Sequence, residues 1–145
     1  MSSQKTVELR LEGNVPSKKN QRINTKEGLS FPSKKFTQWQ DAAMSQVRLQ
    51  TRTRFFKPVS IEVIIYFATL TKADVDNRLT SILDMLAECL VITDDKWESV
   101  PIMKAQGEYR PRNPGAFIRI EELEDGFLGE EYAADRAKLD RKKRK

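Results

Sequence analysis

The chain has 145 residues, which is enough for one domain with a hydrophobic core, and its formal net charge is +5. It contains no histidine and a single cysteine, Cys89. These counts exclude Ser-His-Asp and Cys-His catalytic sites, histidine or cysteine zinc centres, and an intramolecular disulfide. No apolar run approaches the length of a membrane span, and the first residues lack the apolar core of a signal peptide. We therefore expect a cytoplasmic protein without membrane contact.

The charge is unevenly distributed along the chain. The basic excess lies before residue 121, whereas residues 121–145 hold slightly more acidic than basic side chains. A basic domain is typical of nucleic-acid-binding proteins, although the same charge also keeps an ordinary protein soluble. We predict a domain over residues 1–122 and a charged, mobile tail over residues 123–145, in which only residues 130–138 have a helical pattern.

The first half of the chain contains two predicted strands and one predicted helix. Apolar and polar residues alternate over residues 7–12, which indicates a half-buried strand, and residues 23–32 favour a hairpin or an irregular segment. Ser33 is a suitable N-cap for a helix that continues to about residue 51. The β-branched segment 59–70 predicts a strand, and its apolar residues on both faces favour a central position in a sheet.

The second half contains another predicted helix and two more strands. Apolar residues from Val75 to Leu90 recur at helical spacing and predict an amphipathic helix with Asp74 near its N-cap. Residues 99–108 and 115–122 predict strands that are joined by a turn-rich segment. The predicted order is β-α-β-α-β-β, an α/β or α+β fold in one small domain with a mixed sheet.

Four carboxylates flank the second predicted helix. Asp74 and Asp76 lie at its start, and Asp94 and Asp95 follow its end. Crowded carboxylates repel each other unless a cation lies between them, and hard oxygen ligands of this kind suit Mg²⁺ or Mn²⁺. Aspartates at a helix start also act as caps, and aspartate pairs are common in turns. Spacing alone does not decide whether the two pairs meet in the fold.

The order of these motifs resembles the RusA family of Holliday-junction resolvases, or crossover junction endodeoxyribonucleases, many of which are encoded by phages and prophages. The resemblance rests on Lys-Ala-Asp-Val-Asp-Asn at residues 72–77, the apolar helix that follows, and Ile-Thr-Asp-Asp at residues 92–95. The Pro-Ser segment at residues 15–20 agrees with it, and the whole resemblance covers about residues 6–120. It implies a homodimeric, Mg²⁺- or Mn²⁺-dependent endonuclease that nicks two opposed strands of a four-way DNA junction symmetrically. It implies no small-molecule cofactor.

The resemblance also implies which carboxylates bind the metal. It assigns metal binding and catalysis to Asp74, Asp76 and Asp95, with Asp94 as the alternative third ligand. A metal held by carboxylates generates a nucleophilic water and stabilises the charge that develops on the phosphate oxygens. This chemistry needs no histidine, which agrees with a chain that has none.

One position departs from the family pattern. The family has a catalytic lysine one helical turn after the second aspartate, and Thr80 occupies that position here. Threonine supplies no positive charge to the developing transition state. Lys72, Arg78 and Lys96 are the candidate replacements, and we include Lys72 in the predicted catalytic set.

Basic and aromatic side chains supply the candidate DNA contacts. We expect phosphate contacts from Lys18, Lys19, Arg22, Lys34, Lys35, Arg78 and Lys96. Such contacts position DNA without reading its bases, and a solvated basic loop is the alternative interpretation. Phe31, Phe55 and Phe56 are candidates for wedging between bases at the junction centre. Core packing is the favoured interpretation for Phe31, and both interpretations stay open for Phe55 and Phe56.

Two other functions fit the same residues. The first is a recombination accessory protein that binds junctions or other branched DNA with weak or no cleavage, and Thr80 is the residue that favours it. The second is a nuclease that acts on flaps or other branched DNA. The sequence predicts no cleavage-site preference, because metal and phosphate contacts carry no sequence information.

Overall fold

The structure is a computed structural model that describes residues 5–17, 22–24, 26, 28, 30–70 and 73–143, with the backbone alone described at 22–24 and 30–32. In chain order its elements are β1 (Thr6–Glu12), β2 (Arg22–Asn24), β3 (Ser30–Pro32), α1 (Lys34–Gln50), β4 (Val59–Phe67), α2 (Val75–Glu88), β5 (Ile102–Tyr109), β6 (Gly115–Glu122) and α3 (Glu130–Lys143). The predicted order β-α-β-α-β-β is therefore confirmed, with a short β2–β3 hairpin before α1 and α3 after β6.

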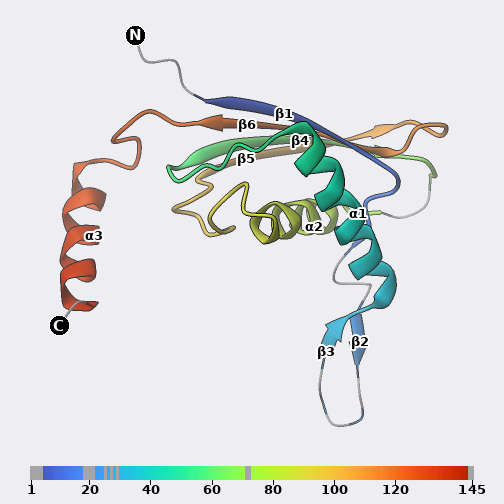
Figure 1. Ribbon diagram of the computed structural model, residues 1–145, viewed down its shortest axis with the longest axis horizontal. Helices are drawn as coiled ribbons and strands as arrows, with labels where there is room; N and C mark the ends of the chain where they lie inside the picture. Colours follow the sequence, from blue (N-terminus) through green and yellow to red (C-terminus); the bar gives the residue numbers. More distant parts are fainter. Residues whose placement is uncertain are drawn as a thin grey trace.

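A four-stranded mixed sheet forms one layer, and α1 and α2 cover one of its faces (Figure 1). The strand order is β1-β6-β4-β5, in which β4 and β5 are parallel and β6 is antiparallel to both of its neighbours. The central position expected for residues 59–70 is confirmed by β4. Because β4 and β5 are parallel, α2 must return the chain from one end of the sheet to the other.

The hydrophobic core lies between the sheet and the two helices. The buried apolar residues of the sheet share one face and are Leu9, Leu11, Val59, Ile61, Val63, Ile65, Ala116, Ile118 and Ile120. Buried residues of α1 and α2 cover them, including Ala43, Val47, Ile82 and Leu86. The predicted N-cap of α1 is confirmed, since the Ser33 Oγ accepts a hydrogen bond from the Phe36 N–H at 3.1 Å. This packing places α2 along the sheet.

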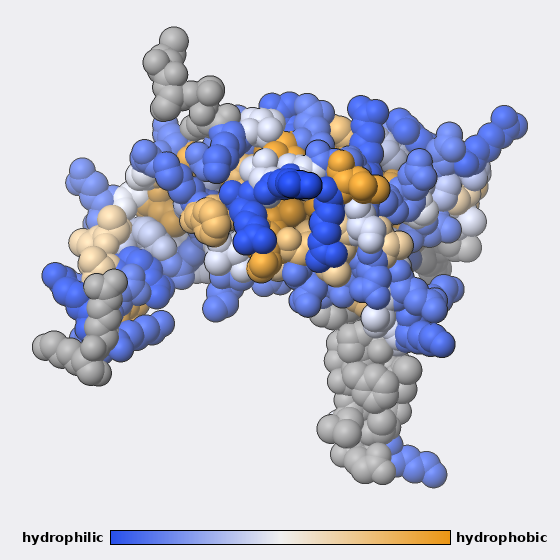
Figure 2. Space-filling model, viewed as in Figure 1, coloured by the Kyte–Doolittle hydropathy of each residue, from blue (hydrophilic) through white to orange (hydrophobic). Residues whose placement is uncertain are grey.

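The other face of the sheet has no helix over it among the described elements (Figure 1). Polar side chains alternate with the core residues along β1 and β6, as a sheet with one solvated face requires. Figure 2 shows that hydrophilic residues also cover most of the visible surface around the helices. No helix in the described part of the chain is both long and apolar enough to cross a bilayer.

Two strands have bounds that differ from the expectation. β4 ends at Phe67 rather than at residue 70, and β5 spans Ile102–Tyr109 rather than residues 99–108. The helix α2 ends at Glu88. The chain leaves α2 through Leu90, whose φ of 64° is left-handed, and the Val91 N–H donates back to the Leu86 carbonyl at 3.0 Å. Such a residue normally ends a helix, although glycine is the usual occupant.

The segment expected to be a mobile tail contains a 14-residue helix, α3. Tyr132 donates a hydrogen bond to a Glu98 carboxylate oxygen, and the Arg136 guanidinium lies 3.4 Å from the same carboxylate. The Tyr132 ring also meets Trp97 edge-on, with ring centroids 5.9 Å apart. These contacts attach α3 to the loop between α2 and β5, while none of its residues is buried.

Candidate active site

The first two aspartates lie at the start of α2 with exposed side chains. Asp74 occupies the N-cap position, but its side chain makes no capping hydrogen bond. Its Oδ2 instead accepts a hydrogen bond from the Asn77 Nδ2 at 3.0 Å. Helix capping therefore does not explain the Asp74 carboxylate, and Asp76 presents its own carboxylate one residue into the first turn. The positive end of the helix dipole favours both charges.

Arg78 is the described cation beside these aspartates. Its Nη1 donates to the Asp74 carbonyl at 3.3 Å, and its guanidinium lies 5.7 Å from the centroid of the Phe67 ring. Thr80 instead turns back along the helix, because its Oγ1 donates to the Asp76 carbonyl at 3.1 Å. Arg78 thus places a positive charge at this end of the sheet, and two contacts restrict its position. Thr80 supplies no charge there. Lys72 lies outside the described residues.

The second pair lies in the loop that follows α2. The Asp94 Oδ1 accepts a hydrogen bond from the Lys96 N–H at 2.9 Å, which closes a tight turn. Asp95 is exposed, and no other described residue forms a hydrogen bond or ion pair with its carboxylate. Asp95 is accordingly the carboxylate of this pair that is available to a ligand, while Asp94 is engaged in the turn.

A single chain does not bring the two pairs together. They lie at opposite ends of α2, whose 14 residues span about 21 Å at 1.5 Å per residue. In Figure 1, the loop that enters α2 and the loop that leaves it lie at opposite ends of the sheet. Across the described part of the chain, no three or more histidine, cysteine, aspartate or glutamate side chains gather closely enough to hold a metal ion. One chain therefore supplies Asp74 and Asp76 to a site without Asp95.

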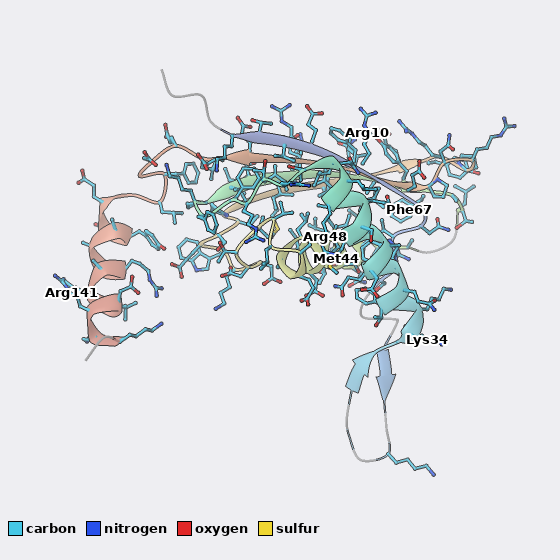
Figure 3. All side chains as sticks on the ribbon, viewed as in Figure 1. Arg10, Lys34, Met44, Arg48, Phe67 and Arg141 are labelled. Carbon is cyan, nitrogen blue, oxygen red and sulfur yellow. The ribbon has the colours of Figure 1, made fainter. Side chains whose placement is uncertain are left out.

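The predicted phosphate contacts are spread over several elements. Lys34 and Lys35 are exposed at the start of α1, and Figure 3 shows Lys34 next to the β2–β3 hairpin. Lys96 is exposed in the Asp94-Asp95 loop. Of the others, Lys18 and Lys19 lie outside the described residues, and Arg22 is described only as backbone in β2.

The three candidate wedge phenylalanines have different surroundings. Phe55 is 2% exposed and belongs to the core, whereas Phe56 is 80% exposed. Phe56 and Asp94 line the same hollow, of about 350 Å³. The side chain of Phe31 lies outside the described part of the structure. Of the two phenylalanines in this set whose side chains the structure describes, Phe56 is therefore the one that is exposed enough to contact a ligand.

Two contacts around the site were not predicted from the sequence. Asn77 holds the Asp74 carboxylate, and its position three residues after Asp74 is the signal from which this contact follows. The attachment of α3 through Glu98 lies only three residues after Asp95. No local pattern predicts that second contact, because it joins residues 38 positions apart.

The described chain is thus an α+β domain with exposed carboxylates at both ends of one helix and exposed basic side chains at several points around it. The family model described as Endodeoxyribonuclease RusA matches residues 12–121, which run from the end of β1 nearly to the end of β6. The chain therefore belongs to the RusA family, and the expected resemblance is confirmed. Membership indicates an endodeoxyribonuclease. A search of curated proteins finds no match to the chain.

Proposed function

We propose that the protein is a homodimeric endonuclease that resolves four-way DNA junctions by symmetric paired nicks with Mg²⁺ or Mn²⁺. The observation that carries this proposal is that the carboxylates of Asp74, Asp76 and Asp95 are exposed. None of the three makes a helix-capping hydrogen bond, and none forms an ion pair with a described cation. Carboxylate oxygens are the ligands that these metals take in proteins. The family assignment supports the same reaction class.

A two-fold dimer reconciles the three aspartates with one metal site. β5 is the edge strand of the sheet and is exposed over most of its length, including the apolar side chains of Ile102 and Met103. An unpaired edge of this length is a template for pairing with another chain. Antiparallel pairing of β5 with its copy sets the two α2 helices side by side in opposite directions. The start of α2 in one protomer then faces the Asp94-Asp95 loop of its partner.

This arrangement makes each site from both protomers. Asp74 and Asp76 come from one protomer, and the third carboxylate is that of Asp95 in the other. A metal bound there would supply a nucleophilic water and neutralise charge on the phosphate oxygens. Arg78, held by the Asp74 carbonyl and the Phe67 ring, contributes positive charge beside the scissile phosphate. Two sites related by a two-fold axis match two opposed strands of a junction.

The test substitutes the aspartates one at a time. We expect Asp74→Asn, Asp76→Asn and Asp95→Asn each to abolish Mg²⁺-dependent nicking of a synthetic four-way junction. Junction affinity, measured in EDTA, should stay within about twofold, because the change removes metal ligands rather than phosphate contacts. Asp135→Asn, an exposed aspartate on α3, is the matched control and should cleave as the wild type does. Full nicking by any of the first three removes that residue from the metal site.

The rival functions give different outcomes with the unaltered protein. An accessory protein binds the junction but leaves every strand intact in Mg²⁺ and in Mn²⁺, and Thr80 in place of lysine is the observation that favours it. A flap nuclease cuts flaps or forks in preference to four-way junctions. Cleavage of matched junction, fork, flap and duplex substrates under single-turnover conditions separates these functions from junction resolution.

A further inference from the structure

The open face of the sheet carries a hollow that the carboxylate site does not use. It has a volume of about 570 Å³ and lies between β1, β4, β6 and the hairpin that joins β5 to β6. Its charged and aromatic lining consists of Arg10, Glu12, Tyr66, Arg110, Arg112 and Phe117. Figure 3 shows Arg10 on the side of the sheet that faces away from α1 and α2.

Two of the three arginines lie over aromatic rings. The Arg110 guanidinium is 3.7 Å from the centroid of the Tyr66 ring, and the Arg10 guanidinium is 5.7 Å from that of Phe117. At 3.7 Å the Tyr66 ring covers the flat face of the Arg110 guanidinium and restricts its motion, while the N–H groups stay directed outward in the plane. The three guanidinium groups form no salt bridge with any described carboxylate. The Arg110 guanidinium is therefore held over a ring, and all three guanidinium groups keep hydrogen-bond donors that no described acidic side chain uses.

The positive charge of the hollow is local to this part of the sheet face. Further along the same face, the strand register sets Glu8, Arg119, Glu62 and Lys104 side by side across β1, β6, β4 and β5. Opposite charges alternate in that row, which makes it neutral. The hollow instead combines three arginines with one glutamate, Glu12. An anion is attracted to this end of the open face and not to its middle.

The hollow lies at the same end of the sheet as the first aspartate pair. The Arg110 N–H donates to the Phe67 carbonyl at 2.8 Å, at the point where β4 ends and the chain turns toward Asp74. Phe67 in turn lies beneath Arg78, on the helix side of the sheet (Figure 3). A polyanion that passes around this end of the sheet reaches Asp74 and Asp76 on one face and the arginines on the other.

We infer that this hollow binds the phosphodiester backbone of the DNA substrate, outside the cleavage site. The inference rests on the proposed function and extends it, since it assigns DNA contacts to Arg10, Arg110 and Arg112. Guanidinium groups match the geometry of phosphate oxygens through paired N–H donors. These contacts position the DNA without reading its sequence.

The test compares two substitutions in the hollow with one in the neutral row. Affinity for a labelled four-way junction is measured by fluorescence anisotropy in EDTA, between about 50 and 200 mM salt. Arg110→Ala/Arg112→Ala should bind about tenfold more weakly at the lowest salt, and the slope of log affinity against log salt should fall by about 2. The control is Arg119→Ala, which removes an arginine from the same sheet face and should change the affinity less than about twofold.

A second pair of variants tests the stacking. Tyr66→Phe keeps the ring beneath Arg110 and should bind as the wild type does. Tyr66→Leu removes the ring and should weaken binding, while circular dichroism and thermal melting report whether the sheet remains folded. Equal binding by the two variants would contradict a positioning role for the Tyr66 ring.

The outcomes separate the hollow from the proposed function. If the wild type binds the junction and the double variant retains its affinity and salt slope, the hollow is not a DNA site and the nuclease proposal stands. If the wild type binds no DNA at all, the proposed function itself fails. Inorganic phosphate or a deoxynucleoside monophosphate, added at constant ionic strength, should not displace the junction at millimolar concentration. Displacement that depends on Arg110 and Arg112 would identify a small-anion site and overturn the inference.

Discussion

Two variants that are each inactive should recover nicking when they are mixed, if every site takes residues from both protomers. The variants are Asp76→Asn and Asp95→Asn, mixed in equal amounts and left to exchange subunits. In a mixed dimer, one site carries both substitutions and the other carries neither. A site built within one chain gives a different result, because each site of the mixed dimer then carries one substitution.

The magnitude follows from the geometry of α2. Its 14 residues separate the two aspartate pairs by about 21 Å, whereas carboxylates that share one Mg²⁺ approach within about 5 Å because each ligand oxygen lies about 2.1 Å from the ion. No side-chain rotation closes that gap within one chain. Random exchange makes half of all dimers mixed, each with one intact site, so about a quarter of the wild-type nicking sites should be recovered.

A supercoiled plasmid with an extruded cruciform gives the clearest assay. Paired nicks by the wild type convert the plasmid to a linear form, whereas one active site per dimer yields mainly nicked circles. Each variant alone should leave the plasmid supercoiled. A mixture with no nicking, although native mass spectrometry shows mixed dimers, would refute the shared site.

Three further outcomes follow from local structure. Leu90 is 52% exposed and adopts a left-handed φ of 64°, which glycine adopts without strain. Leu90→Gly should therefore raise the free energy of unfolding by about 0.5 to 1 kcal/mol in a urea titration. A loss of stability would contradict strain at this position. Burial raises the pKa of the Cys89 thiol above its usual value. Its alkylation at pH 8 should therefore be slower than in the urea-unfolded chain and accelerate as pH rises, and equal rates in the two states would exclude this protection. Tyr132→Phe removes the hydrogen bond to Glu98, so the amide hydrogens of α3 should exchange faster with solvent. Junction cleavage should stay the same. An exchange rate equal to that of the wild type would show that this hydrogen bond does not hold the helix.

The same Tyr132 contact has a pH dependence whose sign follows from its cause. The hydrogen bond to Glu98 raises the pKa of the Tyr132 phenol, because the proton is needed for the bond. The attachment of α3 is thus fully present below the ordinary phenol pKa and is lost as pH rises through the raised value. Limited proteolysis of α3 across this alkaline range should show increasing cleavage in the wild type and no such change in Tyr132→Phe.

Elements with a strong local pattern were predictable from the sequence. The alternation at residues 7–12 and the apolar spacing from Val75 to Leu90 match β1 and α2, because a half-buried strand and an amphipathic helix each expose one face to solvent. Ser33 was identifiable as a cap because its hydroxyl accepts a nearby backbone N–H. The end of α2 was harder to predict, since nothing in the type of residue 90 indicates a left-handed turn.

The candidate site was only partly predictable. The carboxylates themselves are visible in the sequence, but their separation depends on the parallel pairing of β4 and β5, which sends α2 along the full length of the sheet. The arginine-lined hollow depends on β1 pairing with β6, which sets Arg10 opposite Phe117 although the two residues are far apart in the chain. The sequence around residues 110–115 indicates only a turn, and the contact between Arg110 and Tyr66 requires the folded sheet.

The most direct measurement is strand-resolved cleavage of a synthetic four-way junction, labelled on each of its four strands in turn. With Mg²⁺ present, the protein should nick two opposed strands at symmetric positions, and DNA ligase should reseal the resulting duplexes. EDTA and the Asp76→Asn substitution should each eliminate both nicks. A junction that stays intact in Mg²⁺ and Mn²⁺, or cleavage that is equally fast on linear duplex, would contradict a metal-dependent junction resolvase.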